Sequence, residues 1–425
     1  MIGIPIIDKV LKILPWDKSK ELEKVEKIYG IEGKEQFLEL LLIPFVGLES
    51  INDLAESTGQ NKDKYYKMLR NEKINWKALL QEITLHLFLV LLEKYQKSKS
   101  ESTKSRWRPR IIFDDTLIRH WSLSMANVFN RWNYVDKHYM YAQKLVFMIV
   151  VIGDNKLSFP LMFDFISSKK CEDYKSNVEI SLDMLRSLHN IVKSHHLCLD
   201  GVRITCDSGF TNHEIFNLSV ELGLQFYGSL QSKWIFTLSD GTSISVRDLK
   251  NGSIPTRPRV SPKMKREYYR LLASHPKLGN IVLCIVPYYQ PGKTEPLYWV
   301  YCCSYVDIDC VTIYKEHQIR WAIERMFKNL KQYLGIFSYQ GLSSSAHDAW
   351  LTLTALRFLF FQVTLKVAAR FPSLRSNIPL SKFGFAALFR YIRDHFVLDS
   401  KLRKIKRLHY SIVKELPDSF VLVSI

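Results

Sequence analysis

Three acidic side chains lie at positions where a carboxylate could take part in chemistry. Asp114 follows the short apolar stretch RIIF, Asp207 follows VRITC, and Glu324 lies within HQIRWAIERMFKNLKQYLG, whose apolar spacing predicts a helix over 317–335. Carboxylate oxygens suit Mg²⁺ or Mn²⁺. Two such ions can activate the attacking oxygen and stabilise the leaving oxygen during displacement at phosphorus. Because a lone acid at a strand end is usually a cap or turn residue, the three acids matter only as a set.

The predicted helix brings further polar residues onto the side of Glu324. At helical spacing, His317, Arg320, Glu324 and Lys331 share one stripe beside an apolar flank. A charged stripe is normally solvated, and Arg320 and Glu324 could form an ordinary pair one turn apart. A stripe beside the apolar flank points toward the core, however, where unpaired charges are costly. A bound metal ion or phosphate would explain charges at that position.

Alternating strands and helices must position the first two acids. The apolar runs KLVFMIVVIG (144–153) and LSFPLMFDFI (157–166) predict two strands joined as a hairpin. Helices over about 176–195 and over 212–223, and a strand over 224–230, follow from the same patterns. The mixture predicts an α/β core with acids at the C-terminal ends of strands, where open α/β sheets usually bind ligands.

The next segment, residues 231–305, breaks this alternation. An SDGT turn and a QPGKTEP segment each separate short alternating runs, so we expect an inserted, mainly β region with a basic middle. Helical patterns resume near 311 and continue to the C-terminus, including a helix over 383–396.

The first hundred residues carry a helical pattern. The stretch SINDLAESTGQNKDKYYKMLR (50–70) contains a helix, a break at Gly59 and a second helix, which predicts either a DNA-reading helix-turn-helix or a two-helix corner of a bundle. In the first case the recognition helix would open with Gln60, Asn61, Lys62 and Lys64. The polar, basic connector over 97–110 indicates a domain boundary.

The charge balance favours a polyanionic partner. The chain has 60 Lys+Arg against 42 Asp+Glu, a net charge of +18, and phosphate contacts reward such a surplus. Charge alone does not separate DNA from RNA or from an anionic membrane. Seven cysteines without CxxC spacing argue against a disulfide framework and a zinc site, and indicate a reducing cytoplasm.

Two apolar segments could be mistaken for membrane-directed ones. The N-terminus acquires Asp8 and Lys9 too early for a signal peptide. The apolar stretch over 349–369 carries Arg357 and Lys366, which predicts a buried helix and not a membrane span. We therefore expect a cytoplasmic protein with no membrane partner.

Taken in order, the acids and the helix resemble the DDE transposases of bacterial insertion sequences. The features are Asp-x-Thr at Asp114, Asp-x-Gly-Phe at Asp207, and R-x3-E-x6-K over Arg320, Glu324 and Lys331. They are similar, more narrowly, to the group with a Y-x2-R-x3-E-x6-K signature and a β insertion before the glutamate. The resemblance spans roughly 110–335, and its motifs are specific only as an ordered set. The signature's tyrosine position is His317 here.

The resemblance implies an RNase H-like fold in which Asp114, Asp207 and Glu324 hold two Mg²⁺ ions, which Mn²⁺ could replace. Neighbouring strand residues point to opposite faces, so only one of Asp114 and Asp115 can enter the site. The Asp-x-Thr spacing favours Asp114 and leaves Asp115 as the alternative.

The resemblance also implies DNA contacts around the metal site. Arg320 and Lys331 would bind flanking phosphates. In the family the signature's tyrosine and arginine grip a phosphate near the transposon end, and His317 could donate a hydrogen bond there. A tryptophan of the β insertion helps flip a base in related enzymes. Trp234 and Trp299 both lie in that region, and core packing is the alternative for either.

Five segments are therefore expected. They are a helical DNA-binding domain over 1–100, a first part of an RNase H-like core over 101–230, a β-rich insertion over 231–305, a second part of the core over 306–345 and a C-terminal helical region over 346–425. The expected function is cut-and-paste transposition. A homodimer would bind terminal inverted repeats of double-stranded DNA, cleave at the ends and transfer the strands to target DNA. The alternatives are a metal-dependent nuclease without strand transfer and a domesticated, catalytically idle DNA-binding protein.

Overall fold

The structure is a computed structural model that describes residues 10, 12–133, 136–154, 157–168, 171–172, 174–292, 294–368 and 385–395. The expectation about a signal peptide rests on residues 1–9 and lies outside the described residues. So do residues 369–384 and 396–425 of the predicted C-terminal region.

Helices dominate the chain before residue 108. They are the short 3-10 turns η1 (Trp16–Lys18) and η2 (Ile43–Val46) and the helices α2 (Lys20–Tyr29), α3 (Ile31–Leu42), α4 (Ile51–Thr58), α5 (Lys62–Leu69), α6 (Trp76–Lys97) and α7 (Glu101–Trp107). The predicted helix, Gly59 break and second helix are confirmed. Ser50 and Asp53 form a capping box at the start of α4, Gly59 ends α4 at φ +66, and the Asn61 side chain caps α5.

One mixed sheet joins twelve strands of the described chain. The strands are β1 (Pro109–Arg119), β2 (Phe129–Asn133), β3 (His138–Ile152), β4 (Leu157–Phe165), β5 (Arg203–Cys206), β6 (Gln225–Ser229), β7 (Ile235–Leu238), β8 (Ser243–Ser245), β9 (Arg259–Ser261), β10 (Arg266–His275), β11 (Gly279–Tyr288) and β12 (Leu297–Cys303). The main order is β2-β3-β1-β5-β6-β12-β11-β10-β7-β8, with β4 on β3 and β9 on β10. The predicted α/β class and the β3–β4 hairpin are confirmed.

The first core strand is longer than its sequence suggests. We expected it to end at the two acids, but β1 continues to Arg119 because β3 pairs with it along its whole length. The parallel pairing with β5 stops earlier, at Ile112 opposite Thr205. Asp114 therefore lies just past the last described β1–β5 pair, although β1 itself continues.

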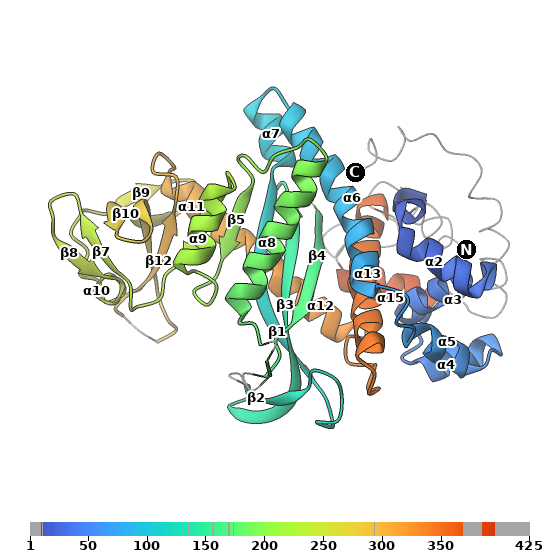
Figure 1. Cartoon of the computed structure of the whole chain (residues 1–425). Helices are drawn as coiled ribbons and strands as arrows, with labels where there is room; N and C mark the ends of the chain where they lie inside the picture. Colours follow the sequence, from blue (N-terminus) through green and yellow to red (C-terminus); the bar gives the residue numbers. More distant parts are fainter. Residues whose placement is uncertain are drawn as a thin grey trace.

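The region predicted as a β insertion extends the sheet. Its last strand, β12, pairs antiparallel with β6, and β11, β10, β7 and β8 follow outward. It also contains the short helix α10 (Val246–Lys250). Figure 1 shows this region at one end of the molecule and the N-terminal helices at the other, with the central strands between them.

Most of the remaining helices of the described chain cover the central strands. The full set is α8 (Asn177–Ser194), α9 (His213–Glu221), α11 (Cys310–Ile319), α12 (Trp321–Gln332), α13 (Ser344–Ala368) and α15 (Phe385–His395). Helix α15 instead packs on η2 and α13. In Figure 1, α8 lies in front of the sheet, where it contacts β3, and α12, which contacts β1, lies behind it. The single helix predicted over 317–335 is wrong in one respect: the chain forms two helices, α11 and α12, that meet at Arg320.

Helix α13 is long and apolar enough to cross a membrane by length and composition. However, 83% of its candidate window, Ser344–Val367, is buried inside the protein. It contacts α6 and β4, and Thr352 on α13 donates a hydrogen bond to the carbonyl of Trp76. These contacts fit the predicted buried helix.

Candidate functional site

Two of the predicted acids come from adjacent parallel strands. Asp114 lies on β1, and Asp207 follows the last residue of β5. The Asp207 Oδ1 atom accepts hydrogen bonds from the backbone N–H groups of Gly209 (2.8 Å) and Phe210 (3.0 Å). A Cβ at residue 209 would lie 3.3 Å from the same oxygen. The glycine of Asp-x-Gly-Phe therefore lets the turn close tightly on the carboxylate.

Asp114 and Asp115 point to opposite faces of the sheet, as strand geometry requires. The Asp115 carboxylate pairs with Lys144 on β3 at 2.9 Å. The Asp114 carboxylate instead lies 3.5 Å from Arg320, and its other oxygen accepts the backbone N–H of Asp115 at 2.8 Å. Asp114 is thus the member of the pair that faces the junction of α11 and α12.

Arg320 lies between two of the three predicted acids. Its Nη1 atom is 3.5 Å from Asp114 Oδ2, and its Nη2 atom donates to Glu324 Oε1 at 2.7 Å. The Arg320 Nε atom is buried and has no hydrogen-bond partner among the described residues. The side chain of Glu324 is 37% exposed, whereas that of Arg320 is 11% exposed. One guanidinium therefore joins a buried strand acid to a more exposed helix acid.

The charges at this site influence one another strongly. Burial and the negative charge of Asp207 raise the pKa of Asp114 to about 7, although the positive charge of Arg320 acts in the opposite direction. Burial lowers the pKa of Lys331, and the charge of Asp114 partly offsets that effect. The two acids and the two cations therefore lie within electrostatic reach of one another, on one side of β1.

His317 lies on the neighbouring helix, α11, in a dry environment. Its ring centroid is 4.2 Å from that of Tyr301, and its Nδ1 atom is buried without a hydrogen-bond partner in the described part of the chain. Burial and the charge of Arg320 lower its pKa to about 3. The ring is therefore neutral at physiological pH. It can donate one hydrogen bond but contributes no charge.

A buried ion-pair cluster next to this site was not predicted from the sequence. Glu316, on α11, accepts from Arg110 on β1 (Nε at 2.5 Å, Nη2 at 2.8 Å) and from Arg203 at the start of β5. Burial alone would raise the pKa of Glu316, but the two arginines hold it below its ordinary value. The cluster ties α11 to both acid-bearing strands. Its three residues flank strands or lie in a helix, so their sequence context resembles that of solvated surface charges.

The site offers carboxylate oxygens as ligands for a metal ion, but the three carboxylates do not surround one common point. Across the described residues, no group of three or more His, Cys, Asp or Glu side chains is placed to hold a metal ion. Asp114 and Asp207 fit a hard cation because the charge of Asp207 raises the cost of a negative charge on Asp114, which a cation would offset. Glu324 is held by Arg320 and would have to exchange that partner to join them.

The two tryptophans of the β-rich region have different surroundings. Trp234 is packed among Phe236 and His275, with ring centroids at 6.1 and 4.9 Å. Trp299 is 37% exposed and stacks on Tyr288 at 4.3 Å. Trp299 is therefore the ring that solvent can reach more easily.

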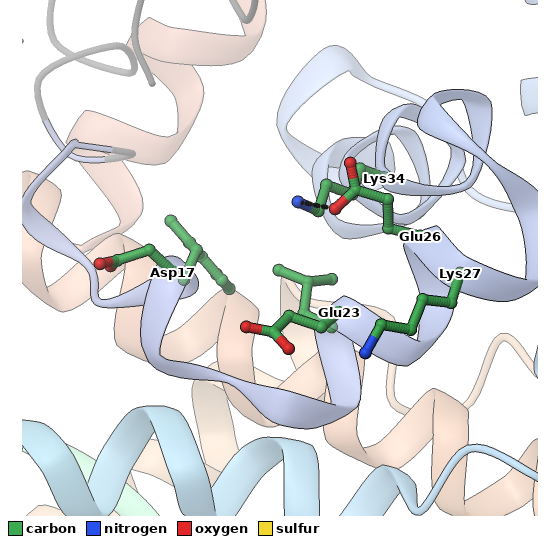
Figure 2. Close-up of a pocket in the computed structure, with 7 residues that line it drawn as sticks. Asp17, Glu23, Glu26, Lys27 and Lys34 are labelled. Carbon is green, nitrogen blue, oxygen red and sulfur yellow. Dashed lines mark ion pairs between the residues drawn. The ribbon is translucent and has the colours of Figure 1, made fainter. Parts of the chain in front are cut away.

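Two surface hollows lie on the N-terminal helices. Figure 2 shows a hollow of about 360 Å³ on α2 and α3 whose polar rim mixes acids and lysines, with Lys34 paired to Glu26. Its lining residues are Trp16, Asp17, Leu22, Glu23, Glu26, Lys27 and Lys34. A second hollow, of about 350 Å³, lies at the α4–α5 turn around Gly59.

Comparisons with known proteins add no name to this geometry. No protein-family model matches the chain, and no curated protein matches it.

Proposed function

We propose that the chain is a DDE transposase that cuts and rejoins DNA by metal-dependent phosphoryl transfer. The observation that carries the proposal is the meeting of Asp114 and Asp207 with Arg320, Glu324 and Lys331. Parallel strands β1 and β5 supply the two aspartates, and the α11–α12 junction and α12 supply the other three residues. An ordered set of weak sequence motifs thus coincides with one electrostatically coupled cluster.

Strand order supports an RNase H-like core. Strands β4, β3 and β1 are neighbours and antiparallel, and β5 and β6 follow in parallel to β1. Helix α8 lies between β4 and β5 in the chain and α9 between β5 and β6, as parallel crossovers require. An RNase H-like sheet has this order, and it places strand-end carboxylates side by side.

Each residue of the cluster has a role in this reaction. Asp114, Asp207 and Glu324 would hold two Mg²⁺ ions, which supply activation of the attacking oxygen and stabilisation of the leaving oxygen when bound. Arg320 would exchange Glu324 for a DNA phosphate and so release the carboxylate. Lys331 would hold a flanking phosphate as a point charge, while neutral His317 offers one hydrogen-bond donor.

DNA recognition is proposed for the N-terminal helices. The first turn of α5 exposes Asn61, Lys62 and Lys64, and the Lys64 side chain donates to Gln60 at 3.2 Å. Polar and basic residues at the start of the second helix of a helix-turn-helix are placed to contact base edges and phosphates. We propose that this surface reads terminal inverted repeats and that two protomers act together, each on one end. Sedimentation of the protein with end DNA tests the dimer, and one protomer per complex would contradict it.

The deciding experiment is cleavage of a plasmid that carries the DNA flanking the gene, in Mg²⁺. Wild type is compared with Asp207→Ala and Glu324→Ala, which should each lose at least about 100-fold activity, given that even partners of metal ligands cost 10–100-fold. Asp115→Asn is the matched control, because its side chain lies on the opposite face, and it should retain activity. Equal activity in all four proteins would overturn the metal-site proposal. Joining of pre-cut 3′-hydroxyl ends separates a transposase from a nuclease.

A catalytically idle DNA-binding protein is the second candidate. The Arg320–Glu324 pair and the histidine at the signature's tyrosine position favour it, because the pair keeps Glu324 from the other two carboxylates and the histidine replaces a phosphate-binding tyrosine. Such a protein would bind end DNA with steep salt dependence but would not cleave it. The plasmid assay therefore decides between the two candidates as well.

A further inference from the structure

A two-stranded ribbon projects past the central sheet. β1 and β3 pair as far as Arg119 opposite Ala142, and beyond that point β3 pairs with β2, from Phe129 opposite Ala142 to Asn133 opposite His138. Figure 1 shows β2 at the lower edge of the molecule, away from both groups of helices. The ribbon therefore adds little to the buried core.

The ribbon nevertheless carries large aromatic side chains on its surface. Trp132, Tyr139 and Tyr141 are 39%, 65% and 43% exposed. Trp132 lies directly opposite Tyr139, with ring centroids 5.1 Å apart, and Tyr141 follows two residues later on the same strand face. A cluster of exposed rings on a projecting ribbon is the kind of surface that marks an interaction site. We call these three residues the aromatic ribbon face.

The aromatic ribbon face lies on the same side of the sheet as Asp114. Side chains alternate along β3, so Tyr139, Tyr141 and Phe147 lie on one face. Phe147 is the register partner of Asp114 and contacts Phe327 of α12 at 5.6 Å between ring centroids. Tyr141 is six residues from Phe147, or about 20 Å along the strand. The residues between them on this face, Gln143 and Leu145, are buried, so a polymer bound at Asp114 would reach the rings by passing over the segments that cover these two residues.

Two exposed basic residues lie near the ribbon. Lys137 is in the turn before β3, next to the aromatic ribbon face. Arg119 is at the end of β1, with its guanidinium 5.0 Å from the centre of the Trp121 ring, but as the register partner of Ala142 it lies on the opposite face. The acid of that turn, Asp136, accepts a hydrogen bond from Asn133 at 2.7 Å. Exposed rings next to cations match unpaired nucleotides, whose bases stack on aromatic rings and whose phosphates bind cations.

We propose that the aromatic ribbon face binds unpaired nucleotides of the DNA strand that lies beside the cleaved phosphate. Trp132, Tyr139 and Tyr141 stack on bases, and Lys137, in the turn before β3, binds an adjoining phosphate. The proposal rests on the proposed function for the identity of the polymer as DNA. It adds a contact site, away from the acids, that distinguishes frayed or single-stranded ends from intact duplex.

The test measures binding without cleavage. Two fluorescent DNA duplexes of equal length, one blunt and one with a four-nucleotide unpaired 3′ tail, are titrated by anisotropy in EDTA. The full chain is compared with the Trp132→Ala/Tyr139→Ala/Tyr141→Ala variant and with a ring-preserving Trp132→Phe/Tyr139→Phe/Tyr141→Phe variant. Tyr289→Ala is the matched control, because Tyr289 is an exposed aromatic (66%) outside the ribbon. Circular dichroism melting checks that all variants fold.

The alanine variant should bind the tailed DNA at least about tenfold more weakly, because stacking on even one ring is worth that much, and should bind blunt DNA as wild type does. The phenylalanine variant and Tyr289→Ala should retain tail binding. An alanine variant with unchanged tail affinity, or with equal losses on both DNAs, would overturn the proposal, as would loss of tail binding in the phenylalanine variant. Wild-type protein that shows this tail preference but never cleaves in Mg²⁺ would refute the proposed function and leave the ribbon proposal standing.

Discussion

Asp114 lies in a largely buried position beside a second acid. These surroundings lower the free energy of unfolding by an amount that depends on pH. Burial, with the charge of Asp207, raises its pKa from 3.8 to about 7. The folded protein therefore keeps a proton on Asp114 over a pH range in which the unfolded chain has lost it. The free energy of unfolding must fall as pH rises from about 4 to about 7, and the full cost is present above pH 7.

Replacing Asp114 by asparagine should remove that cost. Each pKa unit corresponds to about 1.4 kcal/mol, so Asp114→Asn should raise the free energy of unfolding at pH 8 by about 1–4 kcal/mol and change it little at pH 4. Urea unfolding in EDTA at both pH values measures the difference. Asp115→Asn, which removes a carboxylate paired with Lys144 on the other face, is the control and should not stabilise at pH 8. A gain for Asp114→Asn that is the same at both pH values would contradict this account.

Sequence reasoning placed Arg320 and Glu324 on one helical stripe but could not place the Arg320 guanidinium against Asp114. The helical stripe correctly puts Arg320 one turn from Glu324, because that distance is local. The position of its guanidinium against Asp114 depends on where α11 meets α12 and on how that junction lies over β1. Such a contact joins segments about two hundred residues apart, and no periodicity in the chain encodes it.

At the scale of elements, the Glu316 cluster fixes α11 against the strands that carry the acids. Glu316 and Arg110 have side chains only 2% and 3% exposed, and Arg203 contacts the same carboxylate. Glu316→Gln leaves the Arg203 guanidinium without the counter-charge of Glu316, and leaves Arg110 with only the exposed Asp154, at 3.7 Å. We expect the free energy of unfolding to fall by about 3–5 kcal/mol, the usual cost of breaking a buried ion pair from one side. Urea unfolding measures it.

The control for this prediction is a surface pair of similar geometry. Lys175 and Asp183 are 2.7 Å apart, but both are at least half exposed, so Asp183→Asn should change the stability by less than about 1 kcal/mol. Replacing Glu316, Arg110 and Arg203 together by methionine should recover most of the loss, because no uncompensated buried charge remains. A loss below about 1 kcal/mol for Glu316→Gln would show that α11 is held by its apolar contacts alone.

At the scale of the whole molecule, sequence patterns predict single elements but not how distant elements pair. Alternation and apolar runs predicted β3, β4, β5 and β6 because each pattern lies within one element. They could not predict that β12 pairs with β6, so that the β-rich region continues the central sheet. The continuous apolar core also links the N-terminal helices to the sheet through α6 and α13. Whether residues 1–100 form a separate domain stays a prediction.

Arg357 offers a test of that link, because one side chain joins three parts of the chain. It is fully buried on α13 and donates to the carbonyls of Leu40, Leu41 and Leu334, at 2.6, 3.2 and 3.0 Å. Leu40 and Leu41 lie in the last turn of α3, where carbonyls have no partner within the helix. Arg357→Met fills similar space but leaves these carbonyls unpaired, so the free energy of unfolding should fall by about 2–5 kcal/mol.

If the core is continuous, Arg357→Met should lower the midpoint of a single unfolding transition without dividing it. Circular dichroism and tryptophan fluorescence, followed in the same urea titration, should give coincident curves for wild type and variant. Arg186→Met, at an exposed arginine of α8, is the control and should shift the midpoint by no more than about 0.5 kcal/mol. Two separated transitions, with the helical signal lost first, would show that the N-terminal helices unfold on their own and that residue 100 is a true domain boundary. A single shifted transition would mean that a mutation in these helices also destabilises the strands that carry Asp114 and Asp207.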